Sequence, residues 1–154
     1  MPIISTSLGN VLIETEGEQL FRLQFTETVA SDEPAEGITK EVKKQLDEYF
    51  SESRVSFDLP LELKGTDFQK SVWEAVNEIP FGQTTTYMKL SQRLGNPAAI
   101  RAVGAAIGAN PILIIVPCHR IIGTNGQLTG YAGGLEKKQA LLELEGFPIQ
   151  KSLF

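Results

Sequence analysis

Short helical patterns, separated by glycine and proline, place the strongest limit on how this chain can fold. The first begins at Thr66 and has Gln69 three residues later, which is the spacing of a capping box. A second covers about 86–94 and is followed by Gly95-Asn96, with Asn96 expected as the N-cap and Pro97 as the first residue of a third helix. Two short helices joined in this way are a helix-turn-helix candidate, although such pairs are also common packing units.

The third of these helices is expected to have two very different faces. Ile100, Val103 and Ile107 recur at helical spacing and mark the face toward the interior. The opposite face offers one long side chain among small residues, whereas a solvated helix face normally carries several charged side chains. Such a face can lie close to another surface, which the sequence leaves open as nucleic acid or protein. Its members are Ala98, Arg101, Ala102, Ala105 and Ala109.

The first 64 residues predict a small α/β lobe. Residues 1–26 are typical of short strands broken at two glycine-containing turns, and apolar and polar side chains alternate over 21–25. Helical spacing of apolar residues follows over 42–50. With Gly65 as the boundary, we expect an N-terminal α/β lobe at 1–64 and a second domain at 65–154.

Charge is distributed unevenly between the two expected domains. The whole chain has a formal net charge of −5, to which residues 1–64 contribute −7 and residues 65–154 contribute +2. No carboxylate occurs between Ile79 and Leu135. A stretch of that length could accept a phosphate backbone without repulsion between like charges. Burial of the same stretch would explain the pattern equally well, so charge alone does not decide.

Composition disfavours several classes of protein. No apolar run approaches the roughly 20 residues needed to span a bilayer, and the first residues lack the basic region and apolar stretch of a signal peptide. The single cysteine excludes an internal disulfide, and with only one histidine beside it a zinc site is disfavoured. We therefore expect a cytoplasmic protein with a reduced thiol and without metal, cofactor or membrane contact.

The chemistry of the sequence centres on Cys118. Five apolar residues at 112–116 predict a buried strand, and Pro117 ends it directly before Cys118 and His119. A histidine can help form the thiolate, which is the nucleophilic species. Neighbouring side chains of a strand point to opposite faces, so the pair requires a turn at Pro117 or a bridging water. The alternative is a buried cysteine that acts only as a small hydrophobe.

A carboxylate near the C-terminus is the candidate third member of this group. The last helix is expected from Leu135 to Glu145, with Gly146 ending it. Leu141 and Leu142 face the core, and Glu145 lies on the same side by helical spacing. A carboxylate there needs a partner and could orient an imidazole. A frayed last turn that reaches water would satisfy it as well.

Several motifs together resemble those of the O6-alkylguanine-DNA alkyltransferases. They are Asn110-Pro111, Ile-Val-Pro-Cys-His-Arg-Ile-Ile at 115–122, Tyr131 with Gly133-Gly134-Leu135, and Glu145-Gly146. The resemblance covers roughly 66–147, and Pro-Cys-His-Arg is its most specific part. It implies a ribonuclease H-like α/β lobe, with a small antiparallel sheet plus a helix, before a mainly helical DNA-binding domain of winged helix-turn-helix-like arrangement. Some relatives bind zinc in the first lobe, but here that lobe contains neither cysteine nor histidine.

The resemblance also implies a reaction. The alkyl group of O6-alkylguanine would pass irreversibly to Cys118, with His119 acting through a water as the base and Glu145 orienting it. The substrate would be double-stranded DNA, bound through the minor groove with little sequence preference, and the damaged nucleotide would rotate out of the stack. Tyr87 would help to turn the nucleotide and assist the leaving guanine. Asn110 would tie the recognition helix to the active-site turn.

Three sets of site residues follow from the same resemblance. The catalytic set is Cys118, His119, Glu145, Tyr87 and Asn110. The DNA-binding set is Arg101, which would fill the gap left by the flipped nucleotide, with Tyr87, Ala98, Ala102, Ala105 and Arg120. The substrate-pocket set is Pro117, Ile121, Tyr131, Ala132 and Gly133, in which Ala132 stands where some relatives have serine.

Three other functions compete with this interpretation. A cysteine hydrolase would need an oxyanion hole, and no clear glycine-rich nucleophile elbow is present. A helix-turn-helix regulator would present several polar side chains to base edges, whereas this helix presents only Arg101. A non-catalytic relative that binds alkylated DNA and recruits repair factors would lack the reactive cysteine. We expect a monomer, and the sequence does not determine the preferred alkyl group, activity on O4-alkylthymine or cooperative binding along DNA.

Overall fold

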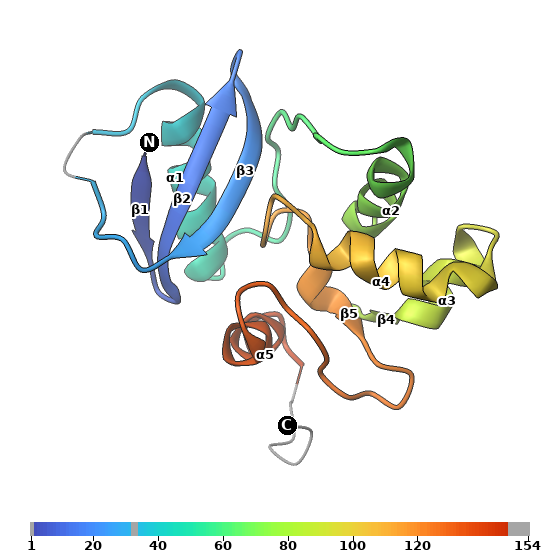
Figure 1. Ribbon diagram of the computed structural model, residues 1–154. Helices are drawn as coiled ribbons and strands as arrows, with labels where there is room; N and C mark the ends of the chain where they lie inside the picture. The colour runs from blue at the N-terminus through green and yellow to red at the C-terminus, as the bar shows by residue number, and fades with distance from the viewer. Residues whose placement is uncertain (1, 32–33, 148–154) are drawn as a thin grey trace. The chain divides into compact units, whose positions relative to one another are not determined.

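The computed structural model describes residues 2–31 and 34–147. Contacts divide the chain into two units (Figure 1). The first consists of Met1–Lys64 together with Pro111–Leu113, and the second of Gly65–Asn110 together with the chain from Ile114 onward.

Three antiparallel strands form the sheet of the first unit. They are β1 (Ile3–Thr6), β2 (Gly9–Glu16) and β3 (Gln19–Thr26), in the order β1-β2-β3. A two-residue turn joins β2 to β3, and Gly17 and Glu18 both have positive φ, of 55° and 65°. Hairpins favour such turns because their twist matches the twist of the two strands.

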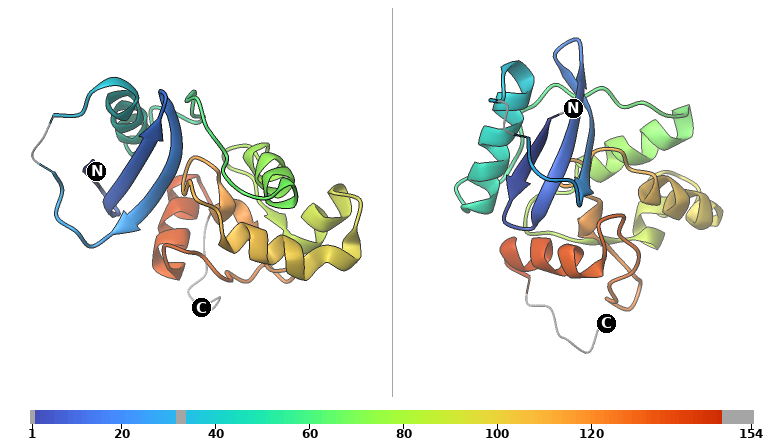
Figure 2. Two further views of the ribbon diagram at one scale, coloured as in Figure 1. Left: turned by 45° about the horizontal axis from the view of Figure 1, so that its top comes forward. Right: turned by 60° about the vertical axis from the view of Figure 1, so that its left-hand side comes forward.

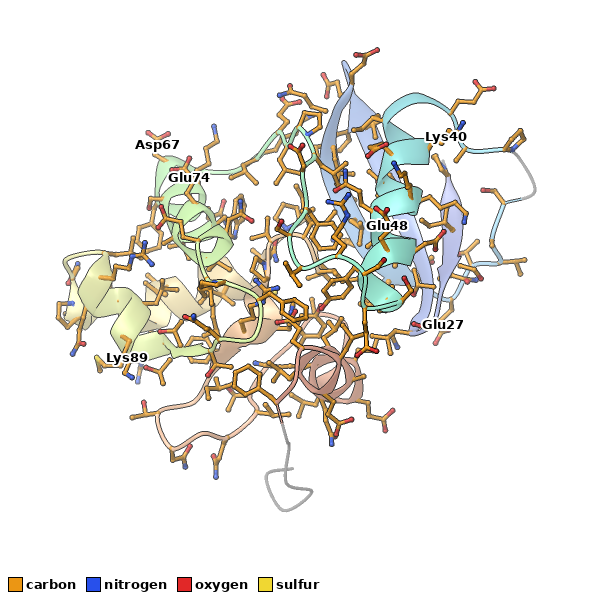
Figure 3. All side chains as sticks on the ribbon, turned by 180° about the vertical axis from the view of Figure 1, so that it is seen from behind. Glu27, Lys40, Glu48, Asp67, Glu74 and Lys89 are labelled. Carbon is orange, nitrogen blue, oxygen red and sulfur yellow. The ribbon has the colours of Figure 1, made fainter. Side chains whose placement is uncertain are left out.

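One helix, α1 (Gly37–Phe50), covers one face of this sheet by packing against β1 and β2 (Figure 2). Val42, Leu46 and Tyr49 recur at helical spacing along α1 and are fully buried. The polar side of the helix carries Lys40 and Glu48, which Figure 3 labels. The core of the unit is completed by the buried strand residues Ile4, Val11, Ile13, Leu20 and Leu23.

The outer edge of β3 is paired at two points instead of being left open. Leu20 pairs with Leu61 and Leu23 pairs with Ile112, both in parallel orientation. The backbone of Leu23 also exchanges hydrogen bonds of 2.9 Å with both chain neighbours of Ile112. Pairing of an edge in this way protects it against association with other strands.

The strand predicted over 112–116 is wrong, although all five residues are buried as expected. Only Ile112 pairs with a strand, and the chain then turns with Ile114 at a φ of 71°. This left-handed conformation is unusual for a β-branched residue and does not continue a strand. The run of apolar residues predicted burial correctly but held no information about a partner for the backbone.

Helices dominate the second unit, and two of them begin at threonine caps. The helix α2 (Asp67–Asn77) starts after Thr66 with both hydrogen bonds of the predicted capping box. The helix α3 (Tyr87–Arg93) starts after Thr86, whose hydroxyl accepts a hydrogen bond from Lys89 N at 3.1 Å. Each cap satisfies a backbone N–H that has no partner within the helix.

The helix α4 (Ile100–Gly108) follows α3 after a tight turn. One turn of 3₁₀ helix, η1 (Pro97–Ala99), precedes it, so the α-helical geometry begins later than expected, and Asn96 makes no side-chain capping bond. The indole of Trp73 on α2 donates to Ala106 O on α4 at 2.7 Å and fastens the two helices together. The opposite side of α2 is polar, with Asp67 and Glu74 exposed (Figure 3).

Short elements complete the second unit. The strand β4 (Thr85–Thr86) pairs in parallel with β5 (Ile121–Ile122), a pairing that the sequence did not predict. One turn of 3₁₀ helix, η2 (Cys118–Arg120), leads into β5. The last helix, α5 (Leu135–Leu144), ends as predicted before Gly146, which has a φ of 96°.

The predicted fold class is therefore confirmed: a small antiparallel sheet with one helix precedes a mainly helical unit. Within residues 2–31 and 34–147 no helix is long and apolar enough to cross a bilayer. The same residues contain no cluster of three or more His, Cys, Asp or Glu side chains suited to a metal ion.

Candidate active site

Pro117 turns the chain immediately before the reactive residues. Its φ and ψ are −82° and 61°, and Cys118 N donates to Val116 O at 2.8 Å. These values define an inverse γ-turn. The turn expected at Pro117 is thus present, and η2 places Cys118, His119 and Arg120 in helical geometry, all three buried.

Asn110 holds the thiol in place. This buried residue follows α4, and its Nδ2 donates to Val116 O at 2.9 Å and to Cys118 Sγ at 3.2 Å. One amide group therefore joins the end of α4 to both sides of the γ-turn. A donor directed at sulfur favours the thiolate over the thiol.

Cys118 nevertheless rests as a neutral thiol. Burial raises the pKa of Cys118 to about 11, and the hydrogen bond from Asn110 and the charge of Lys138 offset only part of that increase. At neutral pH the nucleophile is therefore protonated, and a base is needed to activate it.

His119, the residue that follows Cys118, forms a buried pair with Glu145. His119 Nε2 lies 2.7 Å from Glu145 Oε2, and neither side chain is exposed. Burial lowers the pKa of His119 despite the opposing effect of Glu145, so the imidazole is neutral at neutral pH. A carboxylate can only accept, so the proton of the neutral ring belongs on Nε2 and Nδ1 keeps its lone pair. Nδ1 is buried and has no hydrogen-bond partner among the described residues.

The expectation that Glu145 might lie in a frayed turn and reach water is wrong. Its carboxylate accepts bonds from Arg120 Nε to Oε1 at 2.7 Å and from Arg120 Nη2 to Oε2 at 3.0 Å. The backbone N–H of Gly82 adds a longer bond to Oε1, at 3.4 Å. Arg120, His119 and Gly82 thus converge on one carboxylate, which fixes its orientation toward His119.

Arg120 has a different place from the one expected of a DNA-binding residue. It is 6% exposed, and besides its two bonds to Glu145 its Nη1 donates to Ile79 O at 2.6 Å. The guanidinium also lies 5.8 Å from the centre of the Phe81 ring. Since its donors are directed into the interior, we remove Arg120 from the expected DNA-binding set.

Lys138 is a buried cation that the sequence did not single out. It lies on α5, and its Nζ donates to Thr129 O at 2.7 Å and to Gly130 O at 3.3 Å. Burial lowers its pKa to about 8, and the neighbouring Cys118 has the opposite, smaller effect. The lysine ties the loop before Tyr131 to α5 and supplies positive charge near the sulfur.

A cavity of about 250 Å³ opens beside the thiol. It brings together four residues of the expected site, Tyr87, Cys118, Tyr131 and Ala132, whereas Pro117, Ile121 and Gly133 are not part of its wall. Tyr87 OH donates to Thr129 O at 3.3 Å and so connects α3 to the loop before Tyr131. The wall also includes Gly104, Ile107, Gly108 and Gly130, of which the sequence analysis assigned none to the pocket.

The smooth face of η1 and α4 is exposed as expected. Ala98, Arg101, Ala102, Ala105 and Ala109 are all accessible, while Val103 and Ile107 on the other side are buried. The same helix therefore presents a flat surface outward and lines the cavity with Gly104 and Gly108.

The second unit combines two helices joined by a tight turn, a buried group of Cys118, His119 and Glu145, and a cavity lined by Cys118. Two family models match the chain: "6-O-methylguanine DNA methyltransferase, DNA binding domain" over residues 67–147, and "6-O-methylguanine DNA methyltransferase, ribonuclease-like domain" over residues 2–63. The chain belongs to this family.

Individual relatives agree along nearly the whole length. A methylated-DNA–protein-cysteine methyltransferase of Methanosarcina acetivorans is 47% identical over 150 residues, covering 94% of this chain and 96% of the relative. The crystal structure of Mycobacterium tuberculosis OGT in complex with DNA is 44% identical, with a TM-score of 0.85 over 93% of this chain and 90% of that one. The crystal structure of S. pombe Atl1 with DNA containing O6-carboxymethylguanine is 32% identical, with a TM-score of 0.51 over 59% of this chain and 87% of that one.

Proposed function

We propose that this protein repairs alkylated DNA by moving a methyl or other alkyl group from O6 of guanine to Cys118, once per molecule. The observation that carries the proposal is the position of Cys118 at the wall of the cavity of about 250 Å³, with His119, the next residue in the chain, paired to the buried Glu145. Family membership and the names of the relatives support the same assignment.

The reaction is a single displacement at the alkyl carbon. The thiol of Cys118 gives its proton through one water to His119 Nδ1, the buried nitrogen that has no partner among the described residues. A bond forms between Sγ and the alkyl carbon, the bond from that carbon to O6 breaks, and its electron pair stays on the guanine. The guanine regains one proton at N1, which balances the proton lost by the thiol. The thioether is inert, so the sulfur is not regenerated.

The smooth face of α4 is the proposed DNA-binding surface. Exposed Ala98, Ala102 and Ala105 would let the helix approach the floor of the minor groove, where readout of sequence is degenerate. Arg101 is the only long side chain on this face and would occupy the space of an extruded nucleotide. Extrusion costs a few kcal/mol, and an inserted side chain offsets part of that cost. Tyr87 and Tyr131 then line the cavity that receives the base.

Intact-protein mass spectrometry tests the proposal directly. The protein is mixed with a duplex oligonucleotide that contains one O6-methylguanine, and Cys118→Ala serves as the control. We expect a stoichiometric gain of one methylene mass on Cys118 and none in the control. Absence of any gain would refute alkyl transfer. If tight binding to the lesion persisted in that case, the protein would be a non-catalytic damage-binding relative.

The proposed partner is double-stranded DNA that contains O6-alkylguanine, and the proposed acting form is a monomer. All the residues proposed for the reaction come from the second unit of one chain, so the chemistry needs no second copy. A free thiol as nucleophile also requires a reducing compartment, which favours the cytoplasm. Sedimentation of the protein with and without a short lesion-bearing duplex measures both the oligomeric state and the stoichiometry.

A further inference from the structure

Arg120 is the one charged residue of the Pro-Cys-His-Arg motif that the proposed reaction does not use. It follows His119 directly on η2 and contacts Glu145 through two nitrogens, at 2.7 and 3.0 Å. Its third nitrogen, Nη1, donates to Ile79 O at 2.6 Å. The guanidinium therefore binds both oxygens of the carboxylate that His119 also contacts. A lysine would not reproduce this bidentate geometry.

Charge balance around His119 depends on this contact. Glu145 raises the pKa of His119 through its hydrogen bond and its negative charge, whereas burial and the positive charges of Arg120 and Lys138 lower it. Cys118, which precedes His119 in the chain, is a neutral thiol at neutral pH. A carboxylate without the arginine would attract a proton to the imidazole and convert the base into an acid.

We infer that Arg120 is a positioning residue for the alkyl transfer: it fixes the Glu145 carboxylate and balances its charge, so that His119 remains a neutral base with Nδ1 free. The inference rests on the proposed function, and it assigns the arginine to the interior instead of the DNA. If Arg120 served only the stability of the fold, its replacement would lower the free energy of unfolding and leave the midpoint of the His119 titration unchanged. The two roles therefore differ in a measurable property.

His119 is the only histidine in the chain, so its imidazole can be followed alone by nitrogen-detected NMR. This readout reports the protonation and tautomer of the ring without any alkyl transfer. Two variants are compared with the wild type: Arg120→Met, which removes the charge, and Arg120→Lys, which keeps a charge but loses the bidentate contact. A pH series of the single-turnover transfer rate is measured on the same proteins.

In Arg120→Met we expect the midpoint of the His119 titration to rise by about one pH unit or more. Below the wild-type midpoint the transfer rate should fall about tenfold for each unit of the shift, whereas above the new midpoint it should change little. Arg120→Lys should titrate near the wild type but show a mixture of ring tautomers. A folded Arg120→Met protein whose His119 titrates as in the wild type would overturn the inference.

Loss of the arginine leaves a buried carboxylate without its cationic partner, so Arg120→Met can fail to fold. In that case the comparison is made between Glu145→Gln and the double variant Arg120→Met with Glu145→Gln, where no unpaired carboxylate remains. The midpoint of His119 should then be higher in the double variant, because the single variant retains the uncompensated positive charge. Equal midpoints would refute the inference. A shifted midpoint without any alkyl transfer in the wild type would instead refute the proposed function and leave only the effect of Arg120 on the protonation of His119.

Discussion

Raising the pH should destabilise the protein through Cys118 in a way that can be measured separately from other groups. The unfolded thiol titrates at its usual pKa of 9.0, whereas burial raises the pKa of the folded thiol to about 11. Between these values the unfolded chain has lost a proton that the folded chain keeps, so the free energy of unfolding falls as the pH rises. At about pH 10.5 the loss from this group is about 2 kcal/mol, since one unit of pKa corresponds to about 1.4 kcal/mol.

Lys138 titrates with the opposite sign. Burial lowers its pKa from 10.5 to about 8, so above about pH 8 the folded chain releases a proton that the unfolded chain still binds. This contribution makes the free energy of unfolding rise with pH. The slope of the wild-type curve contains both effects, and only a comparison with a variant that lacks the thiol isolates Cys118.

The assay is urea unfolding of the wild type and of Cys118→Ala over about pH 8 to 10.5. Trp73 is the only tryptophan and is buried on α2, so its fluorescence reports on the unit that contains the thiol. The variant loses a buried sulfur at every pH, which changes its stability by a constant amount. The advantage of the wild type should shrink by about 2 kcal/mol across the range. If the free energies of unfolding of the two proteins differed by the same amount at every pH, the pKa of Cys118 would not be raised by folding, and the reasoning would be refuted.

Three further predictions concern the second unit. Replacement of the exposed Arg101 by alanine should slow transfer from a lesion in duplex DNA at least about tenfold but leave transfer from the free alkylated base unchanged, and equal slowing on both would contradict its role in extrusion. Thr66→Ala removes the capping box of α2 and should lower the free energy of unfolding by about 1 kcal/mol in urea. In Gly65→Ala the new Cβ would lie 2.6 Å from the ring of Trp73, so unfolding should become easier by about 1–3 kcal/mol, and unchanged stability would mean that the ring moves freely.

Much of the fold could be predicted because its signals are local. The capping box at Thr66 and the glycine at position 146 place the ends of α2 and α5 within a residue or two. The pairing of β4 with β5 could not be predicted, since two-residue strands show no periodicity and their partners lie far apart in the chain. The same limit explains the error at 112–116, where burial was evident and the backbone partner was not.

In the candidate site, too, local features could be predicted and contacts between distant residues could not. Cys118 and His119 could be proposed because their chemistry is rare in this chain, where each residue type occurs once. Arg120 was placed in the DNA-binding set that follows from the resemblance, whereas its burial depends on a carboxylate 25 residues away in the chain. Gly104 and Gly108 are four residues apart and thus share a face of α4, but only the tertiary structure reveals a cavity there.

The resting state of Cys118 has a consequence for the working life of the molecule. Oxidation to a sulfenic acid needs an accessible thiolate, and this sulfur is a protonated thiol on a residue that is 4% exposed. Peroxide and small electrophiles should therefore react with it slowly, although the proposed chemistry makes it a strong nucleophile once a lesion occupies the cavity. A protein that reacts only once needs an unmodified thiol until it meets a lesion. Burial of the sulfur therefore protects each molecule against side reactions that would inactivate it.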